Sequence, residues 1–186
     1  MRASLPFACG FQSFALRSAA QDKAPTRDAS VGELRAIIDA TARANFEAAC
    51  LAVTRDATQK KLRIYAIKSE AETGTVKCDD VEVEVVYHKD LAAENRNSAG
   101  AYHQHHNQQV LCFAASQFAE GKKALGLRLV KLLAEADPYL WWSSPDHPGL
   151  TIEKIVAGLE KDDETVRDFL KEQSKEWAYR VKYYGR

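Results

Sequence analysis

From residue 97 to the C-terminus, apolar side chains recur at intervals of three and four residues, and this pattern constrains the fold more than any other feature. Such spacing gathers the apolar residues on one face of a helix. We therefore expect helices over 98–119, 122–136, 152–159 and 164–183. The second should end at Asp137-Pro138, because the residue before a proline is disfavoured in helical conformation. The expected buried positions of the first two helices are Tyr102, Val110, Phe113, Phe118, Leu125, Leu129, Leu132 and Leu133.

The segment before residue 97 combines one more helix with short strands. Ser30 and Glu33 have the spacing of a capping box, which predicts a helix running to about Val53. Residues 62–67 are β-branched and aromatic, and 81–85 alternate valine with glutamate, so that the valines face inward. The prediction is an α+β fold, predominantly helical, with about five helices and a small two-stranded antiparallel β element. Its open edge would be a place where a partner chain could add a strand.

Length and composition predict a single globular domain over 30–186, with a helix and a β hairpin in 30–95 and helices alone in 96–186. The chain has 186 residues, and 46% of them are hydrophobic. No uninterrupted apolar run is longer than the six residues of 110–115, far short of the roughly 20 residues that a membrane-spanning helix needs. We therefore expect no transmembrane segment. The formal net charge of zero gives no global field to attract nucleic acid or anionic lipid.

Residues 1–29 form an N-terminal arm that resembles a mitochondrial transit peptide. Residues 1–21 contain Arg2, Arg17 and three serines but no acidic residue. On a helix, one face would carry Phe7, Phe11 and Phe14. A secretory signal fits less well, because polar residues interrupt any apolar stretch, and an ordinary surface arm is the remaining alternative. The pattern leaves open whether the arm is cleaved or kept as a docking element.

The four cysteines have the distribution of reduced thiols. They are Cys9, Cys50, Cys78 and Cys112. No C-x-x-C pair occurs, so neither a zinc ribbon nor a redox dithiol is indicated. Wide spacing in a chain of this length is also not typical of a disulfide scaffold.

The densest polar cluster lies at residues 102–107, where His103, His105 and His106 occur together. On a helix His103 and His106 would share a face, and His105 would point away. A catalytic metal needs three protein ligands, and no H-E-x-x-H motif accompanies these residues. We therefore expect a polar helix face or an interface, with no metal ligand, cofactor-binding residue or catalytic residue assigned. A small metal-dependent enzyme using His103 and His106 is the alternative.

Residues 151–170 have a spacing that resembles a helix-turn-helix. In the DNA-binding version, the start of the second helix enters the major groove beside phosphates. Here that end carries Asp162, Asp163 and Glu164, whose carboxylates would repel phosphate. We expect two helices packed at an angle and no DNA partner.

Aromatic residues gather at both ends of the chain and in the loop near residue 141. Trp, Tyr and Arg are enriched at interface hot spots, so we expect these residues to bind partner proteins. Aromatic rings interleaved with basic residues could instead stack on single-stranded RNA or lie at lipid headgroups. The candidate partner-binding residues are Phe7, Phe11, Phe14, Trp141, Trp142, Tyr179, Arg180, Tyr183, Tyr184 and Arg186.

These features together favour an accessory, non-catalytic subunit of a large mitochondrial inner-membrane complex. The respiratory chain or the ATP synthase is the expected host, and the protein should be peripheral on the matrix side. Its expected partners are other subunits of the complex, and a peripheral contact with the membrane is possible. The chain contains no nucleophile elbow, P-loop or dinucleotide-binding glycine motif. A peripheral mitochondrial ribosomal or RNA-binding protein is a further alternative to the metal-dependent matrix enzyme.

Overall fold

The computed structural model describes residues 31–67, 74–87, 98–140, 142, 146–147 and 149–185. Contacts divide the chain into two compact units, Met1–Ile37 and Ile38–Arg186. Of the first unit, only the beginning of helix α1 is described. The expected arm, with Phe7, Phe11 and Phe14, therefore lies outside the described residues.

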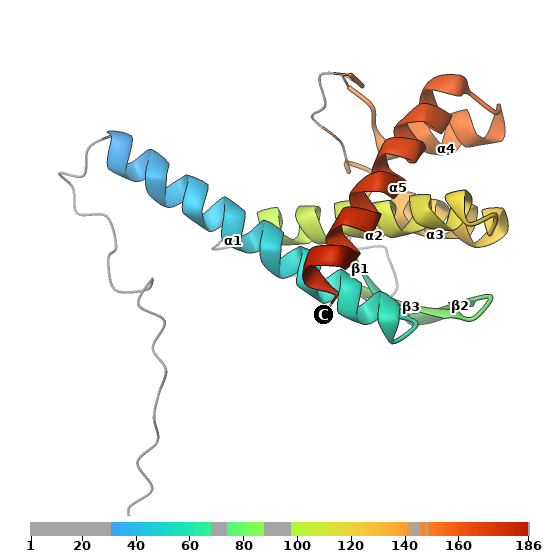
Figure 1. Ribbon diagram of the computed structural model, residues 1–186, viewed down its shortest axis with the longest axis horizontal. Coiled ribbons are helices and arrows are strands. Elements are labelled where there is room, and N and C mark those ends of the chain that lie inside the picture. Colours follow the sequence, from blue (N-terminus) through green and yellow to red (C-terminus); the bar gives the residue numbers. More distant parts are fainter. Residues whose placement is uncertain are drawn as a thin grey trace, which may run out of the picture. The chain divides into compact units, whose positions relative to one another are not determined.

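The described residues form five helices, which confirms the prediction of a predominantly helical chain (Figure 1). Their bounds are α1 Val31–Thr58, α2 Ser98–Ala119, α3 Lys123–Ala136, α4 Ile152–Glu160 and α5 Glu164–Tyr184. Helix α1 runs past the predicted end at Val53. No glycine or proline interrupts it there, and the turn that follows leaves the helical region only at Lys60, where φ is 56°.

The sheet has three strands, so the prediction of two antiparallel strands was wrong. The strands are β1 Lys61–Ala66, β2 Gly74–Cys78 and β3 Val81–Tyr87, in the order β1-β3-β2. Strand β1 is parallel to β3, whereas β2 is antiparallel to it. A tight turn, with φ of 52° at Asp79, joins β2 to β3. Sequence patterning missed β2 because it begins at a glycine and only one of its five residues, Cys78, is fully buried.

Helices cover the outer edge of β1, and β1 therefore does not present the open edge that the sequence suggested. The side chain of Asn107 bonds both backbone groups of Tyr65. The ring of His106 lies 2.8 Å from the Arg63 carbonyl, and the N–H of Ile67 donates to the carbonyl of Ala136 at 2.8 Å. Alternate residues of a strand point their backbone groups to the same side, which is why residues 63, 65 and 67 are the ones satisfied from the helices.

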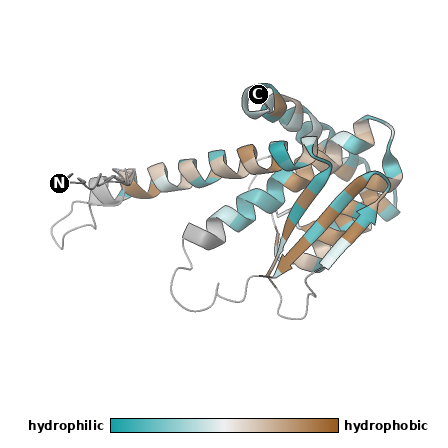
Figure 2. Ribbon diagram, turned by 90° about the horizontal axis from the view of Figure 1, so that it is seen from below, coloured by the Kyte–Doolittle hydropathy of each residue, from teal (hydrophilic) through white to brown (hydrophobic). Residues whose placement is uncertain are grey.

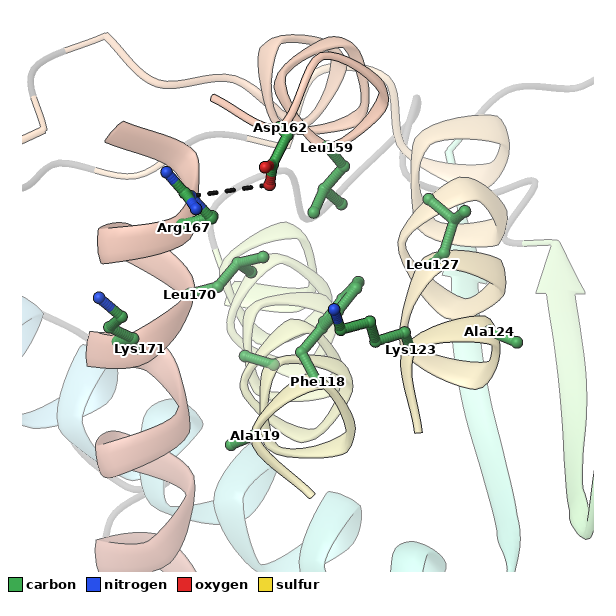
Figure 3. Close-up of a pocket in the computed structure, with 11 residues that line it drawn as sticks. Phe118, Ala119, Lys123, Ala124, Leu127, Leu159, Asp162, Arg167, Leu170 and Lys171 are labelled. Carbon is green, nitrogen blue, oxygen red and sulfur yellow. Dashed lines mark ion pairs between the residues drawn. The ribbon is translucent and has the colours of Figure 1, made fainter. Parts of the chain in front are cut away.

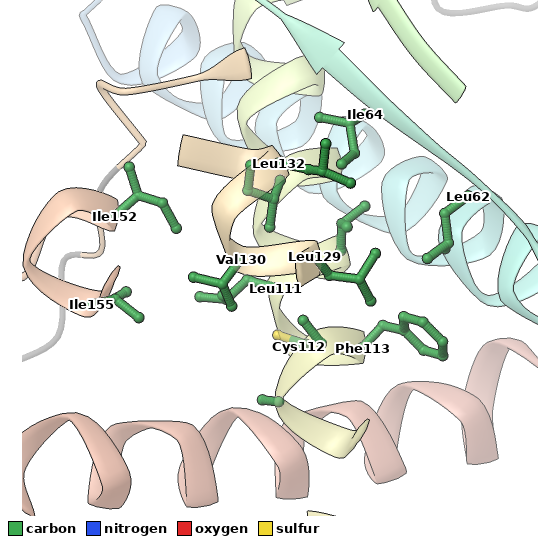
Figure 4. Packing of buried hydrophobic residues seen from close by; sticks show 14 of the residues in the cluster. Leu62, Ile64, Leu111, Cys112, Phe113, Leu129, Val130, Leu132, Ile152 and Ile155 are labelled. Carbon is green, nitrogen blue, oxygen red and sulfur yellow. The ribbon is translucent and has the colours of Figure 1, made fainter. Parts of the chain in front are cut away.

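The core lies between one face of the sheet and the helices (Figure 4). Leu62 and Ile64 of β1 face Leu129 and Leu132 of α3, and Val83 of β3 is also fully buried. Colouring by hydropathy shows the alternation along the strands (Figure 2). The inward orientation of Val81 and Val83 is thereby confirmed. All four leucines expected inside α3 are buried, as are Val110 and Phe113 of α2, whereas Tyr102 and Phe118 are half-buried.

Helices α4 and α5 pack against each other through a very close approach at Gly158. A Cβ atom on Gly158 would lie 2.3 Å from Cγ2 of Val166. Two residues after the end of α4 at Glu160, Asp162 has a φ of 55°, and the N–H of Asp163 donates to the Gly158 carbonyl at 2.9 Å. The carboxylate of Asp163 then caps α5 by accepting from the N–H groups of Thr165 and Val166.

Among the described helices, none combines the length and apolar character that crossing a bilayer would require.

Candidate functional site

The last turns of α5 expose two tyrosines that lie on the same face of the helix. Tyr179 and Tyr183 are 50% and 57% exposed, and we call this pair the α5 patch. Val181, which is 43% exposed, lies on another face of the helix, about 200° around its axis from Tyr179. The two tyrosine rings lie 4.3 Å apart between centroids, as expected for residues four apart on a helix. Their mutual packing restricts both rings before any partner arrives. The patch is therefore an amphipathic surface with limited conformational freedom.

The helix beneath the α5 patch is anchored on its opposite side. Trp177 is buried with its ring 5.2 Å from that of Phe113, and α5 packs mainly on α2. The guanidinium of Arg180 lies over the ring of Phe46 at 4.6 Å and pairs with Glu176 at 2.8 Å. A helix held by a buried tryptophan and a cation–π contact keeps the patch in a fixed position.

The structure separates the other predicted partner-binding residues into two groups. Arg180 and Tyr184 are both half-buried, and Tyr184 lies seven residues after the buried Trp177, on the same face of α5. Trp142 is also half-buried, with its ring 5.4 Å from Phe169, and it completes the core there. The remaining candidates, Phe7, Phe11, Phe14, Trp141 and Arg186, lie outside the described residues.

The histidine cluster of α2 lies against β1. His103 and His106 are both buried and flank the ring of Tyr65, at centroid distances of 4.2 and 4.7 Å. His105 turns away and packs its ring edge-on against Phe46 at 5.6 Å. The prediction that His103 and His106 share a face is thereby confirmed.

The hydrogen bond of His106 determines which of its ring nitrogens carries the proton. Because a carbonyl only accepts, Nε2 donates to the Arg63 oxygen and carries the proton of the neutral ring. Burial lowers the pKa of His106 to about 4, although the Arg63 carbonyl and Asp56 act in the opposite direction. Within the part of the chain that the structure describes, no three histidine, cysteine, aspartate or glutamate side chains are placed to share a metal ion. The geometry gives this ring a structural task, which is to hold β1.

A buried polar network that sequence reasoning missed lies beside the histidines. The Nδ2 of Asn107 donates to the Tyr65 carbonyl at 2.9 Å and to Oδ2 of Asp137 at 3.2 Å, while its Oδ1 accepts from the Tyr65 N–H at 3.0 Å. Burial raises the pKa of Asp137, and the hydrogen bond from Asn107 opposes that rise. The polar run at 102–107 was the available signal, but it could not identify partners 42 and 30 residues away.

The described cysteines are buried and unpaired, in agreement with the prediction of reduced thiols. Cys50, Cys78 and Cys112 are free. Burial raises the pKa of Cys50 to about 11 and that of Cys112 to about 12. Thiols protonated at neutral pH are poor nucleophiles and poor metal ligands.

Comparison of the chain with protein-family models, curated proteins and solved structures finds no match.

Proposed function

We propose that the protein is an accessory, non-catalytic subunit of a large mitochondrial inner-membrane complex, either a respiratory-chain complex or the ATP synthase. It would lie peripherally on the matrix side and act in assembly or stability through contacts with other subunits. The observation that carries this proposal is the α5 patch, where Tyr179 and Tyr183 are exposed side by side on an anchored helix. The mitochondrial location is supported by the acid-free N-terminal pattern.

The α5 patch has the properties of a protein-binding surface. A single exposed apolar residue is ordinary in a folded protein. Tyr179 and Tyr183 form a cluster on one helix face, and tyrosine supplies a large contact area with few rotatable bonds and a hydroxyl that can bond at the interface rim. Because Tyr179 and Tyr183 already pack together, binding would cost little side-chain entropy.

The contacts of two residues, His106 and Arg180, favour this function over the alternatives of a metal enzyme and an RNA-binding protein. His106 uses Nε2 to hold β1, which leaves fewer donors for a metal in the pair His103 and His106. Arg180 is engaged by Phe46 and Glu176, which weakens the basic face that RNA would need at this end of α5. Elemental analysis of the purified protein tests the metal-enzyme alternative, because such an enzyme requires stoichiometric metal that is lost when both histidines are replaced.

Native sizing of the endogenous protein tests the proposal. Mitochondria are solubilised in mild detergent, resolved on a native gel and probed for the protein beside markers of each respiratory complex and the ATP synthase. We expect the protein to comigrate with one of these complexes. It should be enriched in the inner-membrane fraction, and alkaline extraction should release it from that fraction. A protein found in the cytosol, or at the mass of the lone chain in mitochondria, would contradict the proposal.

A further inference from the structure

A groove with a cavity volume of about 540 Å³ lies between the ends of four helices (Figure 3). Its apolar surface comes from Phe118 of α2, Leu127 of α3, Leu159 of α4 and Leu170 of α5. Small residues leave the space open, among them Ala119, which is exposed at the groove. The volume is within the range of about 300 to 1,000 Å³ that is typical of small-molecule sites.

The rim of the groove is basic. It carries Lys123, Arg167 and Lys171, against the single carboxylate of Asp162. Arg167 lies 3.7 Å from Asp162, and Lys171 pairs with Asp168 at 2.9 Å. Lys123, in contrast, has no carboxylate within ion-pair distance among the described residues. An apolar groove with an uncompensated ammonium at its rim is complementary to a molecule with an apolar body and one anionic end.

The dimensions decide between a lipid chain and a partner's helix. A helix with its side chains is about 10–12 Å wide and rises 5.4 Å per turn, so each turn occupies roughly 400 to 600 Å³. The groove would hold about one turn, too little for stable helix docking. A methylene group takes roughly 30 Å³, close to the share of one water molecule, so the same space takes a chain of 12 to 16 carbons with its head at the rim.

We propose that this groove binds a free long-chain fatty acid, with the alkyl chain against Phe118, Leu127 and Leu170 and the carboxylate at Lys123. This inference does not rest on the proposed function, since the groove and the α5 patch use different residues. The carboxylate gains a charge-assisted hydrogen bond from an ammonium that no carboxylate of the described residues approaches to ion-pair distance. Each buried methylene should strengthen binding about fourfold.

Titration calorimetry with dodecanoate, below its micellar concentration and at pH 7.5, tests the inference on the full chain. We expect one saturable site, with octanoate at least 50-fold weaker because four methylenes are lost. Dodecyltrimethylammonium, which has the same tail and the opposite charge, should bind at least tenfold more weakly than dodecanoate. Absence of saturable dodecanoate binding would overturn the proposal, as would equal binding of the two head groups.

Variants locate the site. Ala119→Trp should fill the groove and abolish dodecanoate binding, while Lys123→Glu should weaken it at least tenfold. Lys175→Glu is the matched control, since it makes the same charge change at an exposed position of α5 outside the groove, and it should bind as the wild type does. Circular dichroism and thermal unfolding verify that each variant folds. Binding that survives both Ala119→Trp and Lys123→Glu would place the fatty acid elsewhere and overturn the assignment.

Discussion

The side-chain amide of Asn107 bonds the backbone of Tyr65 as a neighbouring strand would. Its Oδ1 accepts from the Tyr65 N–H at 3.0 Å, and its Nδ2 donates to the Tyr65 carbonyl at 2.9 Å. Strand β1 thus has β3 on one side and a helix side chain on the other. The backbone groups at this sheet edge, which would otherwise need water or another strand, have their hydrogen-bond partners within the chain.

Replacing Asn107 should destabilise the fold. In Asn107→Ala the Tyr65 N–H and carbonyl lose their partners in a buried site, and each unsatisfied group costs about 1–3 kcal/mol. We expect the free energy of unfolding in urea to fall by about 2–4 kcal/mol. Gln104→Ala, half-buried on the same helix, is the control and should change it by less than about 1 kcal/mol. Equal losses in the two variants would show that the amide does not hold the edge.

Acid should destabilise the protein through His106. Its pKa is about 4 in the folded state against 6.5 for the ordinary group, so above pH 6.5 the ring is neutral in both states and contributes nothing. As the pH falls from 6.5 to 4, only the unfolded chain takes up the proton, and stability decreases by about 3 kcal/mol. His106→Gln can still donate to the Arg63 carbonyl but does not titrate.

The measurement for His106 is urea unfolding of both proteins from pH 4 to 7.5. The stability difference between wild type and His106→Gln should change by about 3 kcal/mol across this range. Taking the difference cancels the opposite effect of Asp137, whose raised pKa favours the folded state at low pH. A difference independent of pH would mean that folding does not lower the pKa of His106.

The helices were predictable because their signal is local. Leu125, Leu129, Leu132 and Leu133 repeat within one segment, and burial of that face follows from the repeat alone. The sheet topology depends on contacts distant in sequence. Leu62 pairs with Val83 in a parallel arrangement, and no local pattern distinguishes it from the antiparallel hairpin that was expected.

The candidate sites divide in the same way. Tyr179 and Tyr183 lie four residues apart on one helix, so sequence alone brought them together. The partners of Asn107 are far away in the chain, at Tyr65 and Asp137, and only the fold shows that a polar run is an edge cap. The groove needs four helices to form it. Its residues are ordinary core and surface types in each segment, so no pattern could reveal it.

The close contact at Gly158 should leave no space for a methyl group. In Gly158→Ala the new Cβ meets Cγ2 of Val166 at 2.3 Å and its Cβ at 3.0 Å. Overpacking costs about 1–3 kcal/mol, whereas the higher helix propensity of alanine contributes up to about 1 kcal/mol. We therefore expect a net decrease in the free energy of unfolding, measured by thermal or urea unfolding. Adding Val166→Ala removes the clashing methyl, and the double variant should lose less than the sum of the single variants.

Gly74→Ala is the control for that experiment, because nothing lies within 4 Å of a Cβ there. It should change stability by no more than about 0.5 kcal/mol. Additive losses in the Gly158 and Val166 variants would contradict close packing between α4 and α5.

The buried thiols should be inert until the chain unfolds. In a Cys9→Ser variant, the remaining cysteines are Cys50, Cys78 and Cys112, all buried and with raised pKa values. At pH 8 these thiols stay protonated and shielded, so a thiol-disulfide reagent should titrate none of them in the native protein and all three in guanidinium chloride. A thiol that reacts within minutes under native conditions would show that its surroundings open.

The α5 patch should be needed for assembly but not for folding. The double variant Tyr179→Ser with Tyr183→Ser removes two exposed rings, so the free energy of unfolding should stay within about 1 kcal/mol of wild type. If each ring contributes the roughly 2 kcal/mol of an interface hot spot, affinity for the partner falls by about a thousandfold. Tyr139→Ser, at a tyrosine that is 70% exposed outside the patch, is the control. Each variant is expressed in cells lacking the endogenous protein, and its position on a native gel of mitochondria is compared. We expect only the double variant to leave the high-mass band, and its normal incorporation would mean that another surface holds the protein in its complex.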